Sequence, residues 1–280
     1  MSYRSILVHL DESPRCPVRV DIAARLARVH GAHLHGLAPA GRVNLPAHVV
    51  PSLVGVPDYM AIAQARLHER AAALVDAFVE HARAAGLEAF DGRVVEDDSV
   101  HALVEQAHVH DLVVLGQTDR GSPASSMELN IPDQVFMQSG TPTLVVPYVG
   151  AFDTVGECVI VAWNATRESA RAVRDALPLL RAARRVHLLC FGAARDLHHV
   201  SRLQLDDARR WLARHGVEVV LRQEPVQADV GEVLLSRACD LGADLLVMGA
   251  YSHSRMLEFV LGGVTRRLLA DMTLPVLLSH

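Results

Sequence analysis

Two glycine-containing segments near the end of the chain have the residue types that bind an anion. Gly249 ends the apolar run at residues 244–248, which is typical of a buried parallel strand. Gly262 and Gly263 follow, just before Thr265 and a helical pattern. A glycine lets the backbone pass close to a ligand, and the unpaired amides of a helix N-terminus bind phosphate. These residues therefore predict a site for an anionic ligand such as a nucleotide.

Polar side chains in the same segment offer further contacts to an anion. Ser252 and Thr265 carry hydroxyl groups, and Arg255 carries a positive charge that can reach a phosphate. Each also has a structural alternative, because a hydroxyl can cap a helix and an arginine can be a solvated helix residue. The glycines themselves can serve only to shape a turn between a strand and a helix.

The elements that must position these residues occur twice in the chain. An apolar run at residues 5–10 ends in Asp11, and a matching run at residues 159–163 ends in Asn164. An amphipathic helix rich in Ala, Leu and Arg follows each run, at about residues 17–30 and 168–183. A strand that contains a histidine comes next in both places. The second half of the chain therefore repeats the design of the first.

The closing parts of the two halves match without a gap. The runs at residues 111–116 and 244–249 both end in glycine, and 26 residues separate Gly116 from Pro142, as they separate Gly249 from Pro275. Each half thus alternates strands with helices. This alternation predicts an α/β fold made of two tandem doubly wound, mainly parallel five-stranded sheets, with helices on both faces of each.

The repeat predicts two domains, residues 1–150 and residues 151–280, with the boundary in segment 147–156. The first domain also carries an insert at residues 39–58, which is either a surface loop or a lid, before the longest helix at about 59–85. The closing strands, residues 143–146 and 276–278, are expected to pair within the chain, since unpaired edge strands invite association. A homodimer of the tandem chain is a further option.

Taken together, the pattern resembles a tandem universal stress protein over essentially the whole chain. The resemblance implies a Rossmann-like fold of the adenine nucleotide alpha hydrolase type. ATP-binding members of that family carry an aspartate after the first strand and a loop of the form G-x2-G-x9-G, followed by Ser or Thr, after the fourth strand. In open α/β sheets both elements lie near the topological switch point, at the carboxyl ends of the strands.

The second half keeps most of that phosphate loop. Gly249 and Gly262 match its first and third glycines, while Ser252 replaces the second glycine and Gly263 replaces the Ser or Thr. Thr265 and Arg255 remain in the segment, and Asn164 takes the place of the aspartate. The resemblance therefore implies an adenine-nucleotide site in the second domain, with the phosphates on the loop and Asn164 at the adenosine end.

The first half keeps the acid and loses the loop. Asp11 and Gly116 are present, but Asp119, Leu129 and Pro132 occupy the positions of Ser252, Gly262 and Thr265 in the aligned loop. A carboxylate repels phosphate, a leucine blocks close approach of the backbone, and a proline has no amide to donate. Asp11 and Gly116 are therefore interpreted as a vestigial site.

The leading hypothesis is a cytosolic stress-response protein that acts as an ATP-binding regulatory module, with Mg²⁺ as an optional companion of the nucleotide and an unknown protein as its partner. The chain lacks a G-x-x-x-x-G-K loop followed by Ser or Thr, and it lacks a G-x-S-x-G elbow. No catalytic residue is therefore assigned. Two alternatives stay open: a nucleotide-free interaction scaffold with both clefts degenerate, and a weak ATPase.

Composition narrows the range of partners and compartments. A formal net charge of −5 gives no basic footprint for nucleic acid. The apolar runs are far shorter than the roughly 20 residues that span a bilayer, and the chain starts directly in a strand-like run with no signal-peptide pattern. We therefore expect a cytoplasmic protein that binds neither nucleic acid nor membrane.

The cysteines and histidines show no spacing typical of a dedicated metal site. The four cysteines, Cys16, Cys158, Cys190 and Cys239, stand far apart, so neither a disulfide framework nor a metal site is expected, and Cys16 is placed in a surface turn. Among the 16 histidines, His33 and His35 share one face of a predicted strand, as do His108 and His110 if that segment is extended. Another pair is His198 and His199. None has the spacing of a known metal motif, so no metal site is predicted.

Overall fold

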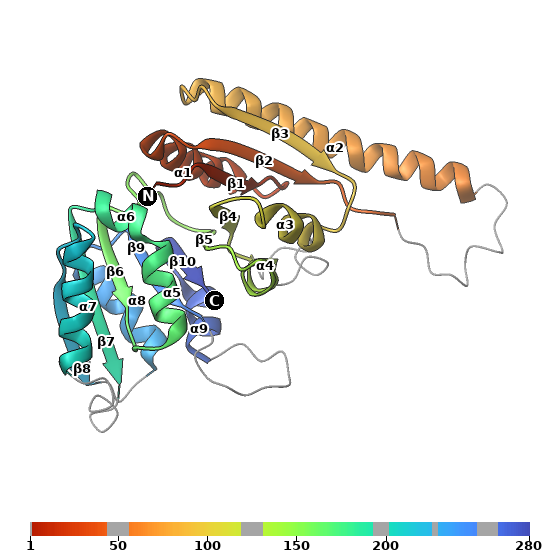
Figure 1. Ribbon diagram of the computed structural model, residues 1–280. Coiled ribbons are helices and arrows are strands. Elements are labelled where there is room, and N and C mark those ends of the chain that lie inside the picture. Colours follow the sequence, from red (N-terminus) through yellow and green to blue (C-terminus); the bar gives the residue numbers. More distant parts are fainter. Residues whose placement is uncertain (1, 44–55, 119–130, 193–201, 226–228, 251–262) are drawn as a thin grey trace.

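A computed structural model describes residues 2–43, 56–118, 131–192, 202–225, 229–250 and 263–280. Its elements alternate between strand and helix in both halves, as the repeat predicts (Figure 1). The first half contains β1 (Ser5–His9), α1 (Cys16–His30), β2 (His33–Pro39), α2 (Val56–Ala84), β3 (Phe90–Val95), α3 (Ser99–Ala107), β4 (Leu112–Gly116), α4 (Ile131–Ser139) and β5 (Thr143–Val146).

The second half repeats this order with one additional short helix. It contains β6 (Cys158–Ala162), α5 (Arg167–Asp175), α6 (Leu177–Ala182), β7 (Arg185–Gly192), α7 (Arg202–Arg214), β8 (Val220–Pro225), α8 (Val230–Asp240), β9 (Leu245–Gly249), α9 (Gly263–Asp271) and β10 (Val276–Ser279). Among these helices, none is both long and apolar enough to cross a lipid bilayer.

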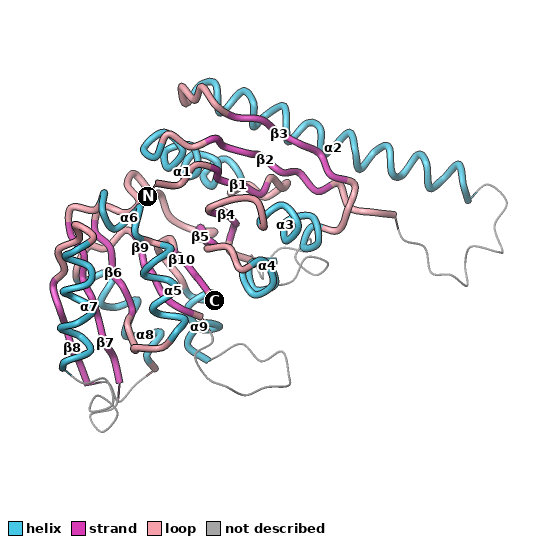
Figure 2. Tube along the Cα trace, viewed as in Figure 1, coloured by secondary structure: helices cyan, strands magenta, loops and turns pink. Residues whose placement is uncertain are grey.

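The ten strands among the described residues form one continuous sheet in the order β3-β2-β1-β4-β5-β10-β9-β6-β7-β8 (Figures 1 and 2). Neighbouring strands within each half are parallel, and this confirms the two doubly wound units. The junction is antiparallel, with Leu144 of β5 opposite Leu277 of β10. The expected pairing of the two closing strands within one chain is thus confirmed. Because the junction is antiparallel, the carboxyl ends of the strands face opposite directions in the two halves.

The central strands are apolar on both faces because helices cover both faces of the sheet. In β1, Ile6 and Val8 pack into the core under α1, whereas Leu7 packs with residues of α3 and α4 on the other face. All three side chains are buried. Burial on both sides explains why these strands read as continuous apolar runs rather than alternating ones.

Three local details differ from the sequence-based expectations. The single helix expected at about 168–183 is two helices, α5 and α6, because Pro178 at the start of α6 lacks the amide that would continue α5. Cys16 is not in a surface turn: it begins α1 and is buried. His108 and His110 do not share a strand face, since His108 follows the last turn of α3, a helix capped by Asp98.

Candidate functional site

The carboxyl ends of the strands form the candidate site in each half, at the switch points between β1 and β4 and between β6 and β9. β1 pairs with both β2 and β4, and β6 pairs with both β7 and β9. The chain passes from β1 to β2 on one side and from β4 to β5 on the other. In the same way it passes from β6 to β7 on one side and from β9 to β10 on the other. In open α/β sheets this divergence creates a crevice for a ligand.

Asn164 lies in the turn that leaves β6. Its Oδ1 accepts hydrogen bonds from the Thr166 backbone amide at 3.3 Å and from the Thr166 hydroxyl at 2.8 Å. Thr166 in turn caps α5 by accepting from the Ser169 amide. Between them Ala165 has a φ of 59°, in the left-handed region. The Asn164 side chain therefore holds a tight turn, as asparagine does well, while the residue itself stays exposed.

Gly249 ends β9 directly against the start of α5. A Cβ at this position would overlap the backbone of Glu168 and the amide of Ser169. The missing side chain therefore lets a helix approach the strand. A glycine at this point can permit either this approach or that of a ligand to the backbone. Its contact with phosphate stays a prediction.

Gly263 is the first residue of α9 and lies at the same edge of the sheet, because α9 leads back to the start of the parallel strand β10. Among the described residues, nothing lies within 4 Å of the position of its Cβ. The first amides of a helix lack partners inside the helix, and such amides can bind an anion. Thr265, two residues further along α9, is buried. Ser252, Arg255 and Gly262 lie outside the described residues.

A cavity of about 350 Å³ opens beside the Asn164 turn, between α5 and α7. Trp163 and Trp211, the two tryptophans of the chain, both line it. The guanidinium carbon of Arg174 lies 5.9 Å from the centre of the Trp211 ring. In the described part of the chain the buried Trp163 indole nitrogen has no hydrogen-bond partner. Sequence analysis did not anticipate this cavity, whose walls come from two separate helices.

Glu168 adds a buried carboxylate next to Gly249. Burial by itself raises the pKa of Glu168, but a hydrogen bond from Arg167 and contacts with nearby backbone lower that pKa overall. The group is therefore ionised at neutral pH. A triphosphate at this edge would meet one negative charge, which favours a nucleotide that brings its own cation.

The corresponding place in the first half is filled by Arg19. This buried guanidinium forms an ion pair with Asp11, with Nη2 2.8 Å from Oδ1, and its Nε donates to the His9 carbonyl at 2.8 Å. Its Nη1 occupies the space that a Cβ of Gly116 would need. The crevice between β1 and β4 thus already contains a cation from the chain itself, and both residues of the proposed vestigial site contact it.

Burial and neighbouring charges shift the pKa values of His9 and Asp11, the two titratable groups beside Arg19. Burial lowers the pKa of His9 to about 4, with Asp11 opposing and Arg19 adding to that shift. Burial raises the pKa of Asp11, but Arg19 and His9 outweigh this and lower it overall. At neutral pH the first crevice therefore holds a neutral imidazole beside a carboxylate–guanidinium pair.

Sequence analysis missed Arg19, although the sequence contains a signal. Arg19 lies on the buried stripe of α1, one turn after Cys16 and one turn before Ala23. A charged residue within an apolar stripe is rarely buried without a partner. The acid that ends the preceding strand, Asp11, is that partner.

The architecture is similar to solved structures over its full length. A universal stress protein from Archaeoglobus fulgidus DSM 4304 aligns with a TM-score of 0.75 at 15% identity, covering 98% of this chain and 97% of that one. A putative universal stress protein from Pseudomonas aeruginosa UCBPP-PA14 aligns with a TM-score of 0.59 at 17% identity, covering 99% and 93%. Among curated proteins no significant match is found. At these identities the likeness establishes the doubly wound tandem fold.

The family follows from the sequence itself. The model of the universal stress protein family matches residues 2–147 and again residues 158–280. The chain therefore belongs to the universal stress protein family and contains two copies of its domain.

Proposed function

We propose that this chain is a nucleotide-responsive regulatory module of the cytoplasm, which binds one adenine nucleotide, ATP in the first instance, in its second domain. The observation that carries the proposal is the N-terminus of α9 at Gly263, which lies at the same sheet edge as the Asn164 turn and has no described residue within 4 Å of its Cβ position. The first amides of a helix lack partners inside the helix and are suited to phosphate. We take residues 1–150 and 151–280 as the two domains.

Each predicted residue has a role in this proposal. The phosphates contact the segment from Gly249 to the start of α9, with Ser252, Arg255, Gly262, Gly263 and Thr265 as the contributing residues. Asn164 faces the adenosine end. The cavity between Trp163 and Trp211 lies beside Asn164 and suits a planar aromatic base. Mg²⁺ accompanies the nucleotide and offsets the charge of Glu168.

The first domain does not bind nucleotide in this proposal. The Arg19 guanidinium occupies its crevice and is already neutralised by Asp11. Binding in one domain therefore changes one end of the molecule, and the surface that this end offers to a partner protein shifts with occupancy.

Native mass spectrometry of the purified chain with and without ATP and Mg²⁺ tests the proposal. We expect one nucleotide per chain. Gly263→Asp places a carboxylate at the start of α9, where no described residue lies within 4 Å of the Cβ position, and we expect it to lower phosphate binding at least tenfold. Gly263→Asn is the matched control, because it adds a side chain of the same size at the same position without the negative charge.

The outcomes separate the three functions. Loss of the adduct in Gly263→Asp alone supports the proposed site, and quenching of tryptophan fluorescence by ATP would place the base in the cavity. No adduct at millimolar ATP would leave the nucleotide-free scaffold. Two nucleotides per chain would show that Arg19 does not close the first domain. Metal-dependent release of phosphate that Gly263→Asp abolishes would identify a weak ATPase.

A further inference from the structure

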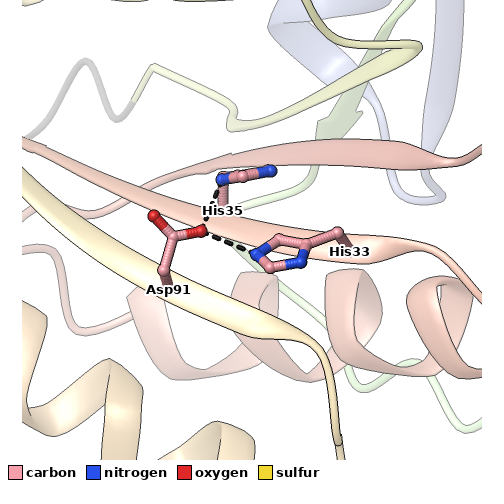
Figure 3. A group of neighbouring side chains, drawn as sticks. All are labelled: His33, His35 and Asp91. Carbon is pink, nitrogen blue, oxygen red and sulfur yellow. Dashed lines mark hydrogen bonds and ion pairs between the residues drawn. The ribbon is translucent and has the colours of Figure 1, made fainter.

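A cluster of two histidines and an aspartate lies at the amino ends of the parallel strands β2 and β3 in the first domain, away from the proposed nucleotide site. His33 and His35 are two residues apart on β2 and share one face, and Asp91 is the residue of β3 that pairs with His35. Asp91 Oδ1 lies 2.7 Å from His33 Nε2 and 2.6 Å from His35 Nδ1. Figure 3 shows both imidazoles directed at this one carboxylate oxygen.

The three side chains have the composition of a transition-metal site. Their ligand atoms all lie within 4.8 Å of one another. Two imidazole nitrogens and one carboxylate oxygen form a common ligand set for Zn²⁺, and three protein ligands leave a fourth position for water or another molecule. The side chains are 41%, 32% and 49% exposed for His33, His35 and Asp91, so an ion can enter from solvent.

A third imidazole supports the arrangement. The ring of His110 lies edge-on to that of His35, with the ring centres 4.7 Å apart. His110 Nδ1 lies 2.6 Å from the Gln106 carbonyl oxygen, which can only accept, so Nδ1 carries a proton. The Nε2 of His110 is buried and has no hydrogen-bond partner within the described part of the chain. The His110 ring therefore packs edge-on against His35 at the side of the cluster.

The second domain provides an internal comparison. The strand register places Arg185, His187 and Val220 where the first domain has His33, His35 and Asp91. One cation and one apolar residue replace two of the three ligands there. The cluster is therefore specific to the first domain.

We propose that His33, His35 and Asp91 form a site for a divalent transition metal, and that the bound ion is Zn²⁺. The ion replaces the hydrogen bonds that now join the two imidazoles to Asp91. Each imidazole then carries its proton on its other ring nitrogen, and water completes the coordination of the ion. The site lies at the opposite end of the strands from Asp11 and Arg19, so it is independent of the nucleotide proposal.

Titration of the full chain with Zn²⁺, followed by calorimetry and by competition with a chelating dye, tests this site. We expect one tight Zn²⁺ per chain, and at least a tenfold loss of affinity in His35→Ala and in Asp91→Asn. His101→Ala is the matched control, since His101 lies between Asp97 and Glu105 in a second, more exposed His–carboxylate group. We expect this variant to bind Zn²⁺ like the original chain.

A second readout keeps the test independent of folding defects. Co²⁺ gives visible absorption bands that report imidazole ligands, and these bands should be lost in His35→Ala at unchanged circular dichroism. Zn²⁺ should also raise the melting temperature of the original chain and of His101→Ala, but not that of His35→Ala. Binding that His35→Ala and Asp91→Asn leave intact, or that His101→Ala abolishes, would overturn the proposal.

Discussion

The two domains share a topology but fill the same crevice by different means. The offset that places Asp11 over Asn164 places Arg19 over Ala172. In the first domain a long cationic side chain reaches from α1 to Gly116, whereas in the second the backbone at the start of α5 comes directly against Gly249. A glycine at the end of the fourth strand is therefore required in both, once for a guanidinium and once for a helix.

This difference also changes the charge of the two sheet edges. The first domain holds a paired Asp11 and Arg19, and the second holds an uncharged Asn164, the Glu168 carboxylate and the helix start at Gly263. The two domains thus keep the same strands and helices, while equivalent positions at their crevices carry different side chains and charges. Three predictions test how far this contrast extends, beginning with the largest effect.

Arg19→Ala should be the most destabilising of these changes. It leaves Asp11 largely buried without its cation, and removing one partner of a buried ion pair costs about 3–5 kcal/mol. The measurement is the free energy of unfolding in urea. Arg28→Ala on the exposed face of the same helix should change it by less than about 0.5 kcal/mol.

A double variant sharpens this test. Removing Asp11 together with Arg19 eliminates the uncompensated charge, so Asp11→Ala combined with Arg19→Ala should be more stable than Arg19→Ala alone. A cost below about 1 kcal/mol for Arg19→Ala would show that the guanidinium is not needed to fill the crevice.

The same substitution at the two equivalent glycines should have unequal costs. Gly249→Ala forces α5 away from β9, because the new methyl group meets backbone, and we expect a loss of about 3 kcal/mol. Gly116→Ala meets the end of the Arg19 side chain, which can shift, so about 1 kcal/mol is expected. Urea unfolding measures both, and Gly263→Ala is the control, since its Cβ would meet none of the described residues. Equal costs at Gly116 and Gly249 would remove the distinction between the two crevices.

Acid should destabilise the first domain through His9. The pKa of His9 is about 4 in the folded chain against 6.5 for an unburied histidine, so the unfolded chain binds more protons between these values. The contribution of neutral His9 to the free energy of unfolding is therefore present above pH 6.5 and is lost as the pH drops toward 4. We expect a loss of about 2 kcal/mol between pH 7 and pH 5.

The variant His9→Gln removes this proton uptake and should reduce the difference in the free energy of unfolding between pH 7 and pH 5. His108→Gln, at an exposed position, should leave that difference unchanged. The second domain has Ala162 in place of His9. A difference between the two pH values that is the same in His9→Gln as in the original chain would contradict the assignment.

The sequence predicts the fold well because its strongest signals are local. Apolar runs, strand-ending glycines and the equal spacing from Gly116 to Pro142 and from Gly249 to Pro275 define the repeat without any knowledge of contacts. The helix expected at 168–183 was wrong in detail because a proline within an apolar helical pattern can either kink a helix or begin a new one.

The candidate site is harder to predict because its contacts join distant parts of the chain. The pairing of Asp91 with His35 depends on the register of two strands, and the cavity between Trp163 and Trp211 depends on how two helices pack. Cys16 was wrongly placed in a turn because α1 begins earlier than its amphipathic pattern indicates. Ser252, Arg255, Gly262, His198 and His199 lie outside the described residues, and the roles of the first three stay predictions.

Because β5 and β10 belong to one chain, the association of the two domains through these strands does not depend on protein concentration. Two separate domains joined through their last strands would come apart on dilution, whereas partners on one chain meet at an effective concentration of roughly millimolar whatever the amount of protein. The pairing should therefore be as complete at nanomolar as at micromolar protein. The strands Thr143–Val146 and Val276–Ser279 also face a fixed counterpart, so each side of the junction can change sequence to suit the other.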